Sequence, residues 1–424
     1  MNIFFLFSLL IIVTALLSYV NTNFLKFPKA IGLTMLSIVF SIGCIIIFDE
    51  GDFIVIAIKQ FDFRTTLLNG MISFMLFASA LCFNAVDLKK ETKAVVALSV
   101  SGVIISTLIT AILAYYTLTL ILNIGSVPFG NCLVFGALIS PTDPIAVIST
   151  LSKNKNVPKP VKVQIVGEAL FNDATSIVLF VVLTNIVFFD PTENLDPNIL
   201  KDIPYIILII KQITIEAVGG ILLGCLFAIV TLFFIRTNKD DETTILITLA
   251  VSSMGYIAAS KLGVSAPITM VIAGLITGKK LSEWNKKKQI KIDLLSKFWR
   301  LIDNILNSFL FIMIGLELTE IDFTTLTIII GFLVFVIMNF SRFISVFIPM
   351  AIINRDFSKS AFKNKTLMTW AGIRGGVSLA LVLSISHDAP HMVAVTYVAV
   401  VLSILIQGST LGALLNKLYP PKIK

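Results

Sequence analysis

Runs of about 20 apolar residues recur from one end of this chain to the other, and no other feature of the sequence constrains the fold as strongly. The hydrocarbon core of a bilayer is about 30 Å thick, so a helix needs roughly 20 apolar residues to cross it. Because 57% of the 424 residues are hydrophobic and only 14% are charged, no soluble domain is expected beside these runs. The sequence therefore predicts an all-α polytopic membrane protein.

Charge clusters and Pro/Gly positions divide the runs into about thirteen predicted transmembrane helices. The predicted spans cover residues 3–21, 30–48, 67–84, 94–117, 128–150, 161–188, 204–235, 243–259, 263–278, 298–316, 324–350, 364–385 and 392–415. The seventh span is long enough to tilt or bend, and the short eighth and ninth spans meet near Gly263.

The net charge of +8 is explained by the membrane rather than by nucleic acid, because 26 of the 33 Lys and Arg residues fall on one side of the predicted spans. These residues occupy 22–29, 87–93, 152–160, 236–242, 279–300, 355–365 and 416–424, together with Lys162. Loops rich in Lys and Arg stay in the cytoplasm. We therefore expect a multi-pass protein of the cell (inner or plasma) membrane, with the N-terminus outside and the C-terminus in the cytoplasm.

Three acids and two bases lie well inside the fifth, sixth, eleventh and twelfth predicted spans, where no loop can account for them: Asp143, Glu168, Asp173, Arg342 and Arg374. An ionisable group at the bilayer centre costs about 2.5 to 3.5 kcal/mol, so such groups mark ion pathways or pairs. Three acids face two bases, and a buried carboxylate without a countercharge must take up a proton or a cation. This is the physical outline of an exchanger. The alternative is that all five charges only hold the helices together, although membrane helices usually associate through small residues.

Two of the predicted spans contain sequences that interrupt a helix. In ISPTDPIAV, Pro141 and Pro144 flank Asp143 and remove two helical N–H donors. In AGIRGGVSLA, three glycines surround Arg374. The two spans are seven apart, an odd offset, so their helices run in opposite directions. This pattern predicts inverted repeats with two broken helices that cross at a transport site.

Charge pairing at such a crossing singles out one acid. Asp143 and Arg374 are suited to neutralise the ends of the half-helices and each other. Glu168 is then free to pair with Arg342, or alternatively with Arg374. Either pairing leaves Asp173 as the exchangeable acid, and because the residue before it is a neutral amide, the site holds one exchangeable charge.

PTDPIAV, GEALFND and GIRGGVSLAL, in this order and spacing, resemble the signature segments of the cation:proton antiporter family that includes bacterial NhaP-type and animal NHE-type sodium/proton exchangers. FLFIMIGLEL at 309–318 and LIQGSTL at 405–411 fit the same pattern. The resemblance implies an NhaA/NhaP-like fold of thirteen helices in a homodimer. It further implies a dimerisation part near 1–90 and 243–320, a core transport part near 91–190 and 324–415, and a linker helix in 191–242.

The resemblance also implies residue roles. These are binding of Na⁺ and H⁺ by Asp173 with support from Asn172 and Thr142, crossing-point charges at Asp143 and Arg374, and a structural ion pair of Glu168 with Arg342. The implied function is secondary active exchange of Na⁺ or Li⁺ for H⁺ by alternating access in pH homeostasis. The Asn-Asp form of the site goes with electroneutral exchange of one ion for one proton.

Two departures from the family pattern leave ion preference open, including a K⁺/H⁺ antiporter of the same fold. Many members carry an acid where this chain has Ala78, and many carry Ser where it has Ala169. Both changes remove oxygens that could face a cation. Glu216 in the seventh span is either a proton relay or a structural group.

Two rival classes and resident cofactors are disfavoured. An intramembrane aspartyl protease would carry Gly-x-Gly-Asp, which neither PTDP nor FNDA supplies, so we expect no enzyme. A cation channel would not need a pair of broken helices. The four cysteines lack metal-ligand spacing, and Pro390 disfavours a helical metal site formed by His387 and His391. We therefore expect no cofactor beyond the transported ions.

Overall fold

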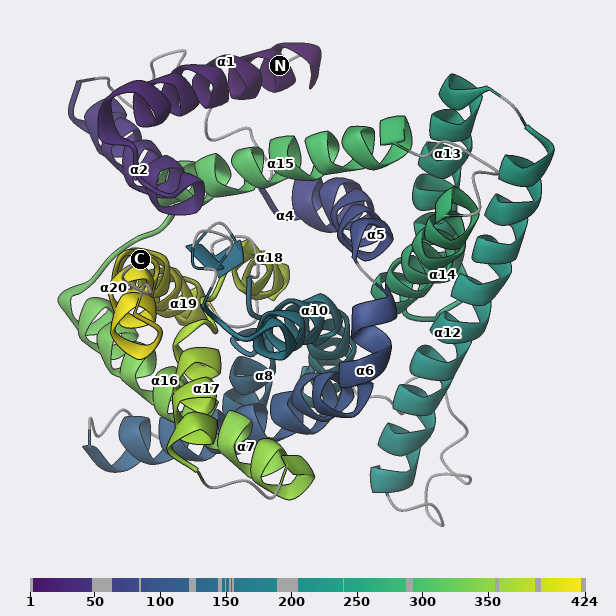
Figure 1. Ribbon diagram of the computed structural model, residues 1–424. Helices are drawn as coiled ribbons and strands as arrows, with labels where there is room; N and C mark the ends of the chain where they lie inside the picture. Colours follow the sequence, from purple (N-terminus) through teal and green to yellow (C-terminus); the bar gives the residue numbers. More distant parts are fainter. Residues whose placement is uncertain are drawn as a thin grey trace. The chain divides into compact units, whose positions relative to one another are not determined.

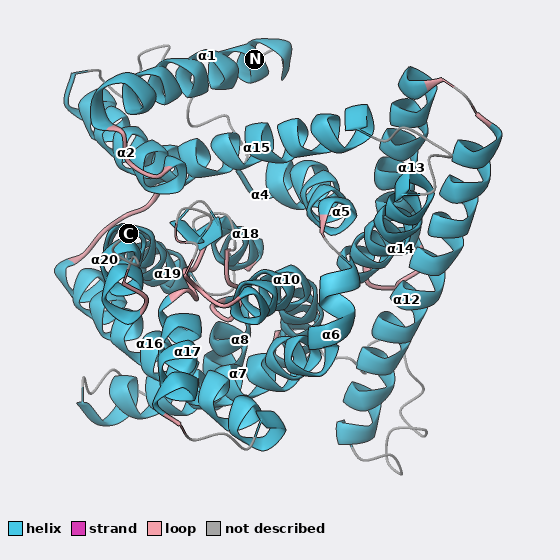
Figure 2. Ribbon diagram, in the orientation of Figure 1, coloured by secondary structure: helices cyan, strands magenta, loops and turns pink. Residues whose placement is uncertain are grey.

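The computed structural model describes residues 3–47, 63–83, 85–121, 127–143, 147–148, 150–151, 154, 156–188, 205–238, 240–286, 293–354, 358–385 and 390–420. Within these ranges the chain forms helices joined by short loops and contains no strand, which Figure 2 shows. The predicted all-α class is therefore confirmed. The chain packs as two compact units: unit 1 comprises Met1–Gly70, Pro141–Val166 and Asn304–Lys424, and unit 2 comprises Met71–Ser140 and Gly167–Asp303.

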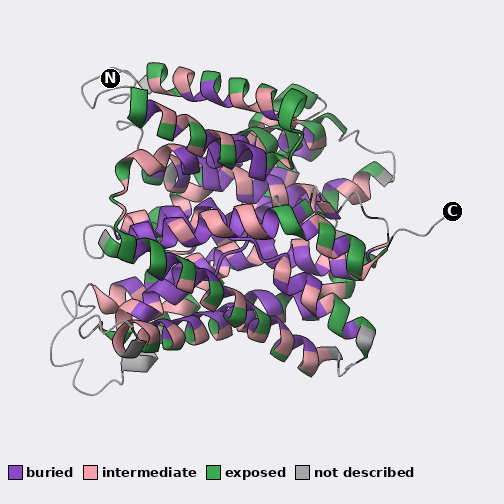
Figure 3. Cartoon of the chain, turned by 90° about the vertical axis from the view of Figure 1, so that its left-hand side faces the viewer, coloured by how far each residue is buried: buried purple, intermediate pink, exposed green. Residues whose placement is uncertain are grey.

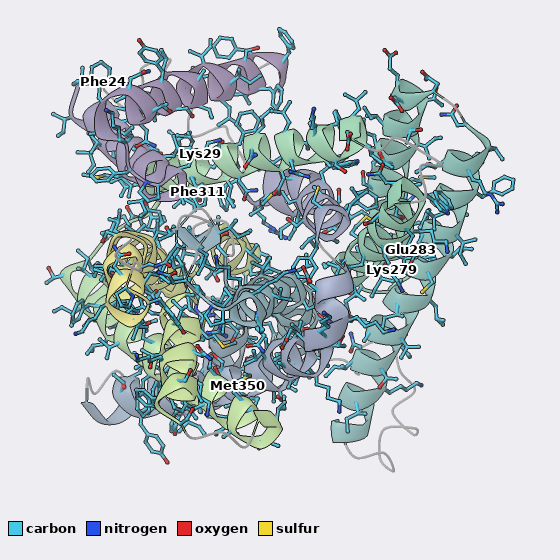
Figure 4. The ribbon with its side chains drawn as sticks, in the orientation of Figure 1. Phe24, Lys29, Lys279, Glu283, Phe311 and Met350 are labelled. Carbon is cyan, nitrogen blue, oxygen red and sulfur yellow. The ribbon has the colours of Figure 1, made fainter. Side chains whose placement is uncertain are left out.

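Ten helices in the described part of the chain are long and apolar enough to cross a membrane. This count does not establish the predicted thirteen. The predicted spans 128–150 and 364–385 are each interrupted, so neither forms one long helix. The predicted span 263–278 corresponds to α14 (Ala266–Lys286), whose last turns carry charges. Figure 4 shows two of them, Lys279 and Glu283, on neighbouring turns of this helix.

Unit 1 contains the N-terminal helices and the last five helices of the chain. Its elements are α1 (Ile3–Val20), η1 (Asn21–Leu25), α2 (Lys29–Ile47), α4 (Phe63–Thr65), α16 (Thr325–Asn354), α17 (Lys359–Trp370), α18 (Gly376–Ser384), α19 (Pro390–Leu402), η6 (Ser403–Gln407) and α20 (Gly408–Leu418). Helix α16 packs on α17 and α19, and α17 packs on α20 (Figure 1). The division between the units falls within η2 (Thr66–Met71), α10 (Lys159–Val187) and α15 (Asp293–Leu316, followed by η5, Glu317–Glu320).

Helix α2 lies against the part of α15 that belongs to unit 1, and both are labelled in Figure 1. The Lys29 ammonium donates to the Asn304 carbonyl at 3.2 Å, and the Ser37 hydroxyl donates to the Phe311 carbonyl at 3.2 Å. A Cβ atom at Gly315 would lie 2.0 Å from the Ser37 hydroxyl oxygen, so the two helices approach closely only because this residue has no side chain.

Unit 2 contains the helices of Met71–Ser140 and Gly167–Asp303. Its elements are α5 (Ile72–Cys82), α6 (Ala85–Val96), η3 (Ala97–Ser101), α7 (Gly102–Tyr116), η4 (Thr117–Ile121), α8 (Phe129–Leu138), α12 (Tyr205–Thr237), α13 (Asp241–Lys261) and α14. Figure 1 shows α12, α13 and α14 side by side, with α5 next to α14. Between α13 and α14, Gly263 has a φ of +66°, a conformation that favours glycine. This confirms the turn predicted there.

Two glycines one turn apart set the contact between α14 and α5. A Cβ at Gly274 would lie 2.7 Å from the Phe77 carbonyl oxygen, and one at Gly278 would lie 2.2 Å from the Leu81 carbonyl oxygen. This G-x-x-x-G spacing lets two helix backbones approach closely, which is a common means of association in membranes. Helices α5 and α14 are therefore held by backbone contact rather than by large side chains.

The outer faces of several helices expose large apolar side chains. Phe4 on α1 is 76% exposed, and Leu222 on α12 is 65% exposed. Figure 3 shows buried and exposed residues alternating along the helices, as expected where one side of a helix packs and the other faces lipid. The exposed apolar surface agrees with a membrane-embedded protein.

Candidate functional site

The first predicted break is present. Helix α8 ends at Leu138, and residues 140–143 are not helical. The turn closes with hydrogen bonds from the Ile139 amide to the Phe135 carbonyl at 3.1 Å and from the Ser140 amide to the Ala137 carbonyl at 3.2 Å. Pro141 then prevents the helix from continuing, because it has no N–H to donate. Pro144 lies outside the described residues.

The second predicted break is also present. Helix α17 ends at Trp370, residues 372–375 are not helical, and α18 begins at Gly376. The Ala371 and Gly372 amides close the end of α17 on the Leu367 and Thr369 carbonyls at 2.9 and 3.1 Å. The backbone groups beyond this point need partners outside the helix.

The two breaks meet within unit 1. The Asp143 amide donates to the Ile373 carbonyl at 2.7 Å, and the Arg374 guanidinium donates through Nη1 to the Pro141 carbonyl at 3.2 Å. Each unwound segment therefore supplies a partner for a backbone group of the other. A Cβ at Gly375 would lie 2.8 Å from the Asp143 Cβ, so the approach of the two segments requires glycine at this position. The structure thus brings together the residues predicted as crossing-point charges.

Both predicted arginines are buried beside the second break. Arg374 is 1% exposed and Arg342 on α16 is 5% exposed. The Arg342 guanidinium lies 3.5 Å from the Met368 carbonyl, near the end of α17. A Cβ at Gly372 would lie 2.7 Å from Arg342 Nε, so this glycine gives the guanidinium its space. One end of the second break is therefore in contact with a buried positive charge.

In unit 2, three polar residues follow one another along one face of α10. Glu168 and Asn172 are each 1% exposed, and Ser176 is fully buried. The Asn172 amide nitrogen donates to Glu168 Oε1 at 3.3 Å and to the Ser140 carbonyl at 3.3 Å, while its oxygen accepts from the Ser176 hydroxyl at 2.9 Å. Because residues four apart share a helix face, this series follows from the sequence spacing. Asn172 thereby binds the Ser140 carbonyl, at the start of the first break.

Asp173 lies on an adjacent face of α10 and is half-buried. Ala169 is one turn before it on that face and is buried, so a serine at position 169 would have stood beside Asp173. Thr142 is buried in the first break. Thr142 and Arg342 belong to unit 1, whereas Asp173 and Glu168 belong to unit 2. The joint cation site and the ion pair of Glu168 with Arg342 therefore stay predictions.

Four polar residues without a predicted role contact these segments: Ser140, Ser176, Ser403 and Gln407. The Ser403 hydroxyl accepts a hydrogen bond from the Arg374 amide at 2.9 Å. Each of the four is a polar residue at span depth, and Gln407 lies in the LIQGSTL segment. Their position inside predicted spans could have identified them, but Ser403 and Gln407 bond to partners 29 and 68 positions away, whereas Ser176 bonds to Asn172 one turn before it.

The remaining sequence candidates lie elsewhere. Ala78 is buried on α5. The Glu216 carboxylate on α12 accepts from the Gln212 amide at 3.3 Å and is half-buried. His391 is exposed on α19, and His387 lies outside the described residues. Lys365, assigned to a loop from the sequence, is instead buried on α17 with its ammonium 5.4 Å from the Phe347 ring centroid, a cation–π contact that makes burial tolerable.

Comparison with known proteins gives consistent results. The family model described as "Sodium/hydrogen exchanger, transmembrane" matches residues 11–417. The Na(+)/H(+) antiporter NhaP of Pseudomonas aeruginosa is 34% identical, with 96% of this chain and 95% of the relative covered. The Na(+)/H(+) antiporter NhaH of Halobacillus dabanensis is 26% identical, with 93% of each chain covered. The solved structure of the sodium proton antiporter MjNhaP1 from Methanocaldococcus jannaschii at pH 8 has a TM-score of 0.74 at 21% identity and covers 99% of this chain and 100% of that one, which shows a common fold.

Proposed function

The chain belongs to the sodium/hydrogen exchanger family, and we propose that it exchanges Na⁺ for H⁺ across a cell membrane as a secondary active transporter. Its named relatives are antiporters, and this proposal assigns it no enzymatic reaction. Exchange of a cation for protons suits a role in pH homeostasis. K⁺ in place of Na⁺ is the alternative that the experiment below distinguishes.

The observation that carries the proposal is the meeting of two unwound segments deep in a membrane protein, at Asp143 with Ile373 and at Arg374 with Pro141. Non-helical backbone is tolerated at membrane depth only where protein covers it or where it lines a cavity. Crossed half-helices direct backbone carbonyls and amides towards one region, and in transporters this region binds the coupling ions. A purely structural bundle would have no reason to retain two such breaks.

In the proposed mechanism, Asp173 is the group that alternates between a proton and a Na⁺. A carboxylate can satisfy its charge with either ion but not with both at once, so loading one requires release of the other. Asn172 and Thr142 supply neutral oxygens beside it, which are ligands that hard cations prefer. Asp143 and Arg374 neutralise the ends of the half-helices.

Coupling requires that the site open to one side of the membrane at a time. We propose alternating access, in which the core part near 91–190 and 324–415 moves against the dimerisation part near 1–90 and 243–320, with 191–242 as the linker. The pair formed by Glu168 and Arg342 would hold the core together during this motion. With one exchangeable charge, each cycle moves one H⁺ against one Na⁺.

The proposal includes topology and assembly. The concentration of Lys and Arg in loops on one side supports an N-terminus outside and a C-terminus in the cytoplasm. We propose that two copies of the chain form a homodimer through the dimerisation part. Crosslinking of single cysteines in membranes would test the dimer, and labelling of termini in intact cells would test the topology.

The decisive experiment uses purified protein in liposomes with an imposed pH gradient and an internal pH-sensitive dye. Addition of Na⁺ or Li⁺ should collapse the gradient, whereas liposomes without protein should retain it. Collapse by K⁺ alone would favour the K⁺/H⁺ alternative. Cation flux that does not move protons would indicate a channel and overturn the proposal.

A further inference from the structure

The last span contains a π-helical turn, η6, between α19 and α20. It carries Ser403 at its start and Gln407 at its end, four residues apart. Ser403 is fully buried and Gln407 is 1% exposed. Single π turns inside membrane helices commonly occur where side chains must reach a functional site. A buried serine and a buried glutamine are costly unless their polar groups are bonded.

The polar atoms of these two residues are bonded to the end of α17 and to the second break itself. The Arg374 amide, within the break, donates to the Ser403 hydroxyl at 2.9 Å. The Gln407 side-chain nitrogen donates to the Trp370 carbonyl, the last residue of α17, at 3.4 Å. The Ser403 hydroxyl donates in turn to Gln407 Oε1. One turn of η6 therefore bridges the end of α17 and the unwound segment that follows it.

The bridge is also bonded to a third helix, α16. The donor and the acceptor in each of its hydrogen bonds can be assigned. The Gln407 nitrogen also donates to Asn339 Oδ1 on α16 at 2.9 Å. The Asn339 nitrogen donates to the Phe335 carbonyl of its own helix at 2.8 Å. Asn339 thus presents an acceptor to Gln407, and Gln407 presents an acceptor to Ser403. The hydroxyl of Ser403 is then left to accept from the Arg374 amide.

We propose that Ser403 and Gln407 are positioning residues for ion exchange, which hold the second break, and with it Arg374 and the start of α18, in the conformation that binds the cation. This inference rests on the proposed function and assigns to it two residues outside the predicted site. They do not touch the ion. They act through the Arg374 backbone, whose guanidinium contacts the Pro141 carbonyl of the other break.

The physical reason is the absence of a helical partner for the Arg374 amide. An unwound segment fixes its amides only through bonds to other elements, and an unbonded buried amide destabilises the conformation that exposes it. Removing the Ser403 hydroxyl should therefore let the segment rearrange. The rearranged segment should bind the cation more weakly, because its backbone groups no longer point to the site.

The test compares Ser403→Ala, Ser403→Thr, Gln407→Met and Gln407→Glu in liposomes. Ser409→Ala is the matched control, because Ser409 is exposed on the next turn and bonds only to the Leu405 and Ile406 carbonyls of its own helix. Exchange is measured against Na⁺ concentration and pH and is normalised to folded protein. Stabilisation of the purified protein against heat by Na⁺ gives a second measure of binding.

We expect Ser403→Ala and Gln407→Met to raise the Na⁺ concentration at half-maximal rate by at least about three- to tenfold, because each variant loses two or more bonds of the bridge and one net hydrogen bond already corresponds to this factor. The Na⁺ concentration that stabilises the protein should rise in parallel, and the pH profile should shift. Ser403→Thr, which keeps the hydroxyl, should restore binding. Gln407→Glu should resemble Gln407→Met or be weaker, because a carboxylate has no donor for Asn339.

Two results would overturn the inference. One is Na⁺ dependence and pH profile equal to those of the Ser409→Ala control in both Ser403→Ala and Gln407→Met. The other is a loss of exchange that follows only the yield of folded protein, which would assign the bridge a structural role alone. If the wild-type protein itself exchanges no cation for protons, the proposed function and this inference both fall.

Discussion

Two neighbouring residues of α10 have different environments. The amide of Asn172 is bonded to Ser140, Glu168 and Ser176, so its orientation is set by its surroundings. Asp173 follows on the next face and is half-buried. An amide whose nitrogen and oxygen are both hydrogen-bonded is suited to hold a site in place. A carboxylate beside it is suited to exchange a bound proton for a bound cation. Transport is proposed for Asp173 because its carboxylate can exchange a proton for a cation, which an amide cannot do.

Asp173→Asn should fold and transport nothing. The amide is nearly isosteric with the carboxylate, but it cannot carry a proton or balance the charge of Na⁺. Exchange in liposomes should fall to the level of protein-free liposomes, and the melting temperature in detergent should stay close to that of the wild type. Exchange at a near wild-type rate in this variant would show that another group carries the proton.

Gly375→Ala should impair exchange by pushing the two breaks apart. The added Cβ would lie 2.8 Å from the Asp143 Cβ and 3.1 Å from its Oδ2. Overpacking of this kind costs about 1 to 3 kcal/mol. Gly412→Ala is the control, since the nearest atom to its Cβ would be Thr150 Cγ2 at an ordinary 3.8 Å. Equal exchange and equal melting temperature in the two variants would refute the close approach at Gly375.

Among the helices, proline alone does not decide where a break forms. Helix α16 is continuous over 30 residues although it contains Pro349. A single proline removes one hydrogen bond and is tolerated in membrane helices when neighbours compensate. Helix α8 instead ends before Pro141, in a segment where a second proline follows three residues later and Ile373 accepts from the Asp143 amide. Breaks form where the unwound backbone finds external partners.

Gly278→Ala should separate α14 from α5 and destabilise the protein. Its Cβ would lie 2.2 Å from the Leu81 carbonyl oxygen, and a helix backbone cannot move aside as a flexible side chain can. We expect a cost of about 1 to 3 kcal/mol and a clearly lower melting temperature in detergent.

The control for this prediction is Gly43→Ala on α2, where an added Cβ would meet no atom within 4 Å. This change should leave the melting temperature unchanged or raise it slightly, because alanine favours a helix by up to about 1 kcal/mol over glycine. A melting temperature of Gly278→Ala equal to that of Gly43→Ala would contradict the glycine-mediated contact.

At the scale of the whole molecule, the number of exchangeable charges determines how transport responds to voltage. In the proposed mechanism, Arg342, Arg374 and Asp143 have fixed structural roles, and Asp173 is the group proposed to exchange a proton for a cation. Glu216 on α12 accepts a hydrogen bond from Gln212 and takes no part in this scheme. A cycle with one proton exchanged for one monovalent cation moves no net charge.

Exchange should therefore be independent of membrane potential. In liposomes with a valinomycin-clamped K⁺ potential and Na⁺ as the coupling ion, the rate and the final gradient should not follow the imposed voltage. The rate should be bell-shaped with pH, because protons compete with Na⁺ for Asp173 at low pH and proton supply limits the cycle at high pH. A voltage-dependent end point would rule out one-for-one exchange and make Glu216 the first candidate for a second proton carrier.

Features that depend only on neighbouring residues could be predicted from the sequence. A run of about 20 apolar residues crosses a membrane because of its own transfer free energy, so the spans could be predicted without knowing what packs against them. Prolines in ISPTDPIAV and glycines in AGIRGGVSLA mark the two breaks for covalent and steric reasons that are equally local. The spacing of Glu168 and Asn172 placed them on one face of a helix.

Which of these features meet depends on how the helices pack. Ser403 bonds to an amide 29 positions away, and Gln407 bonds to a side chain 68 positions away, so no local pattern could identify either pair. Lys365 is buried beside Phe347 although its neighbours in sequence are typical of a loop. A buried polar group is stabilised by the particular atom opposite it, and that atom is set by how helix faces pack rather than by the hydropathy of either helix.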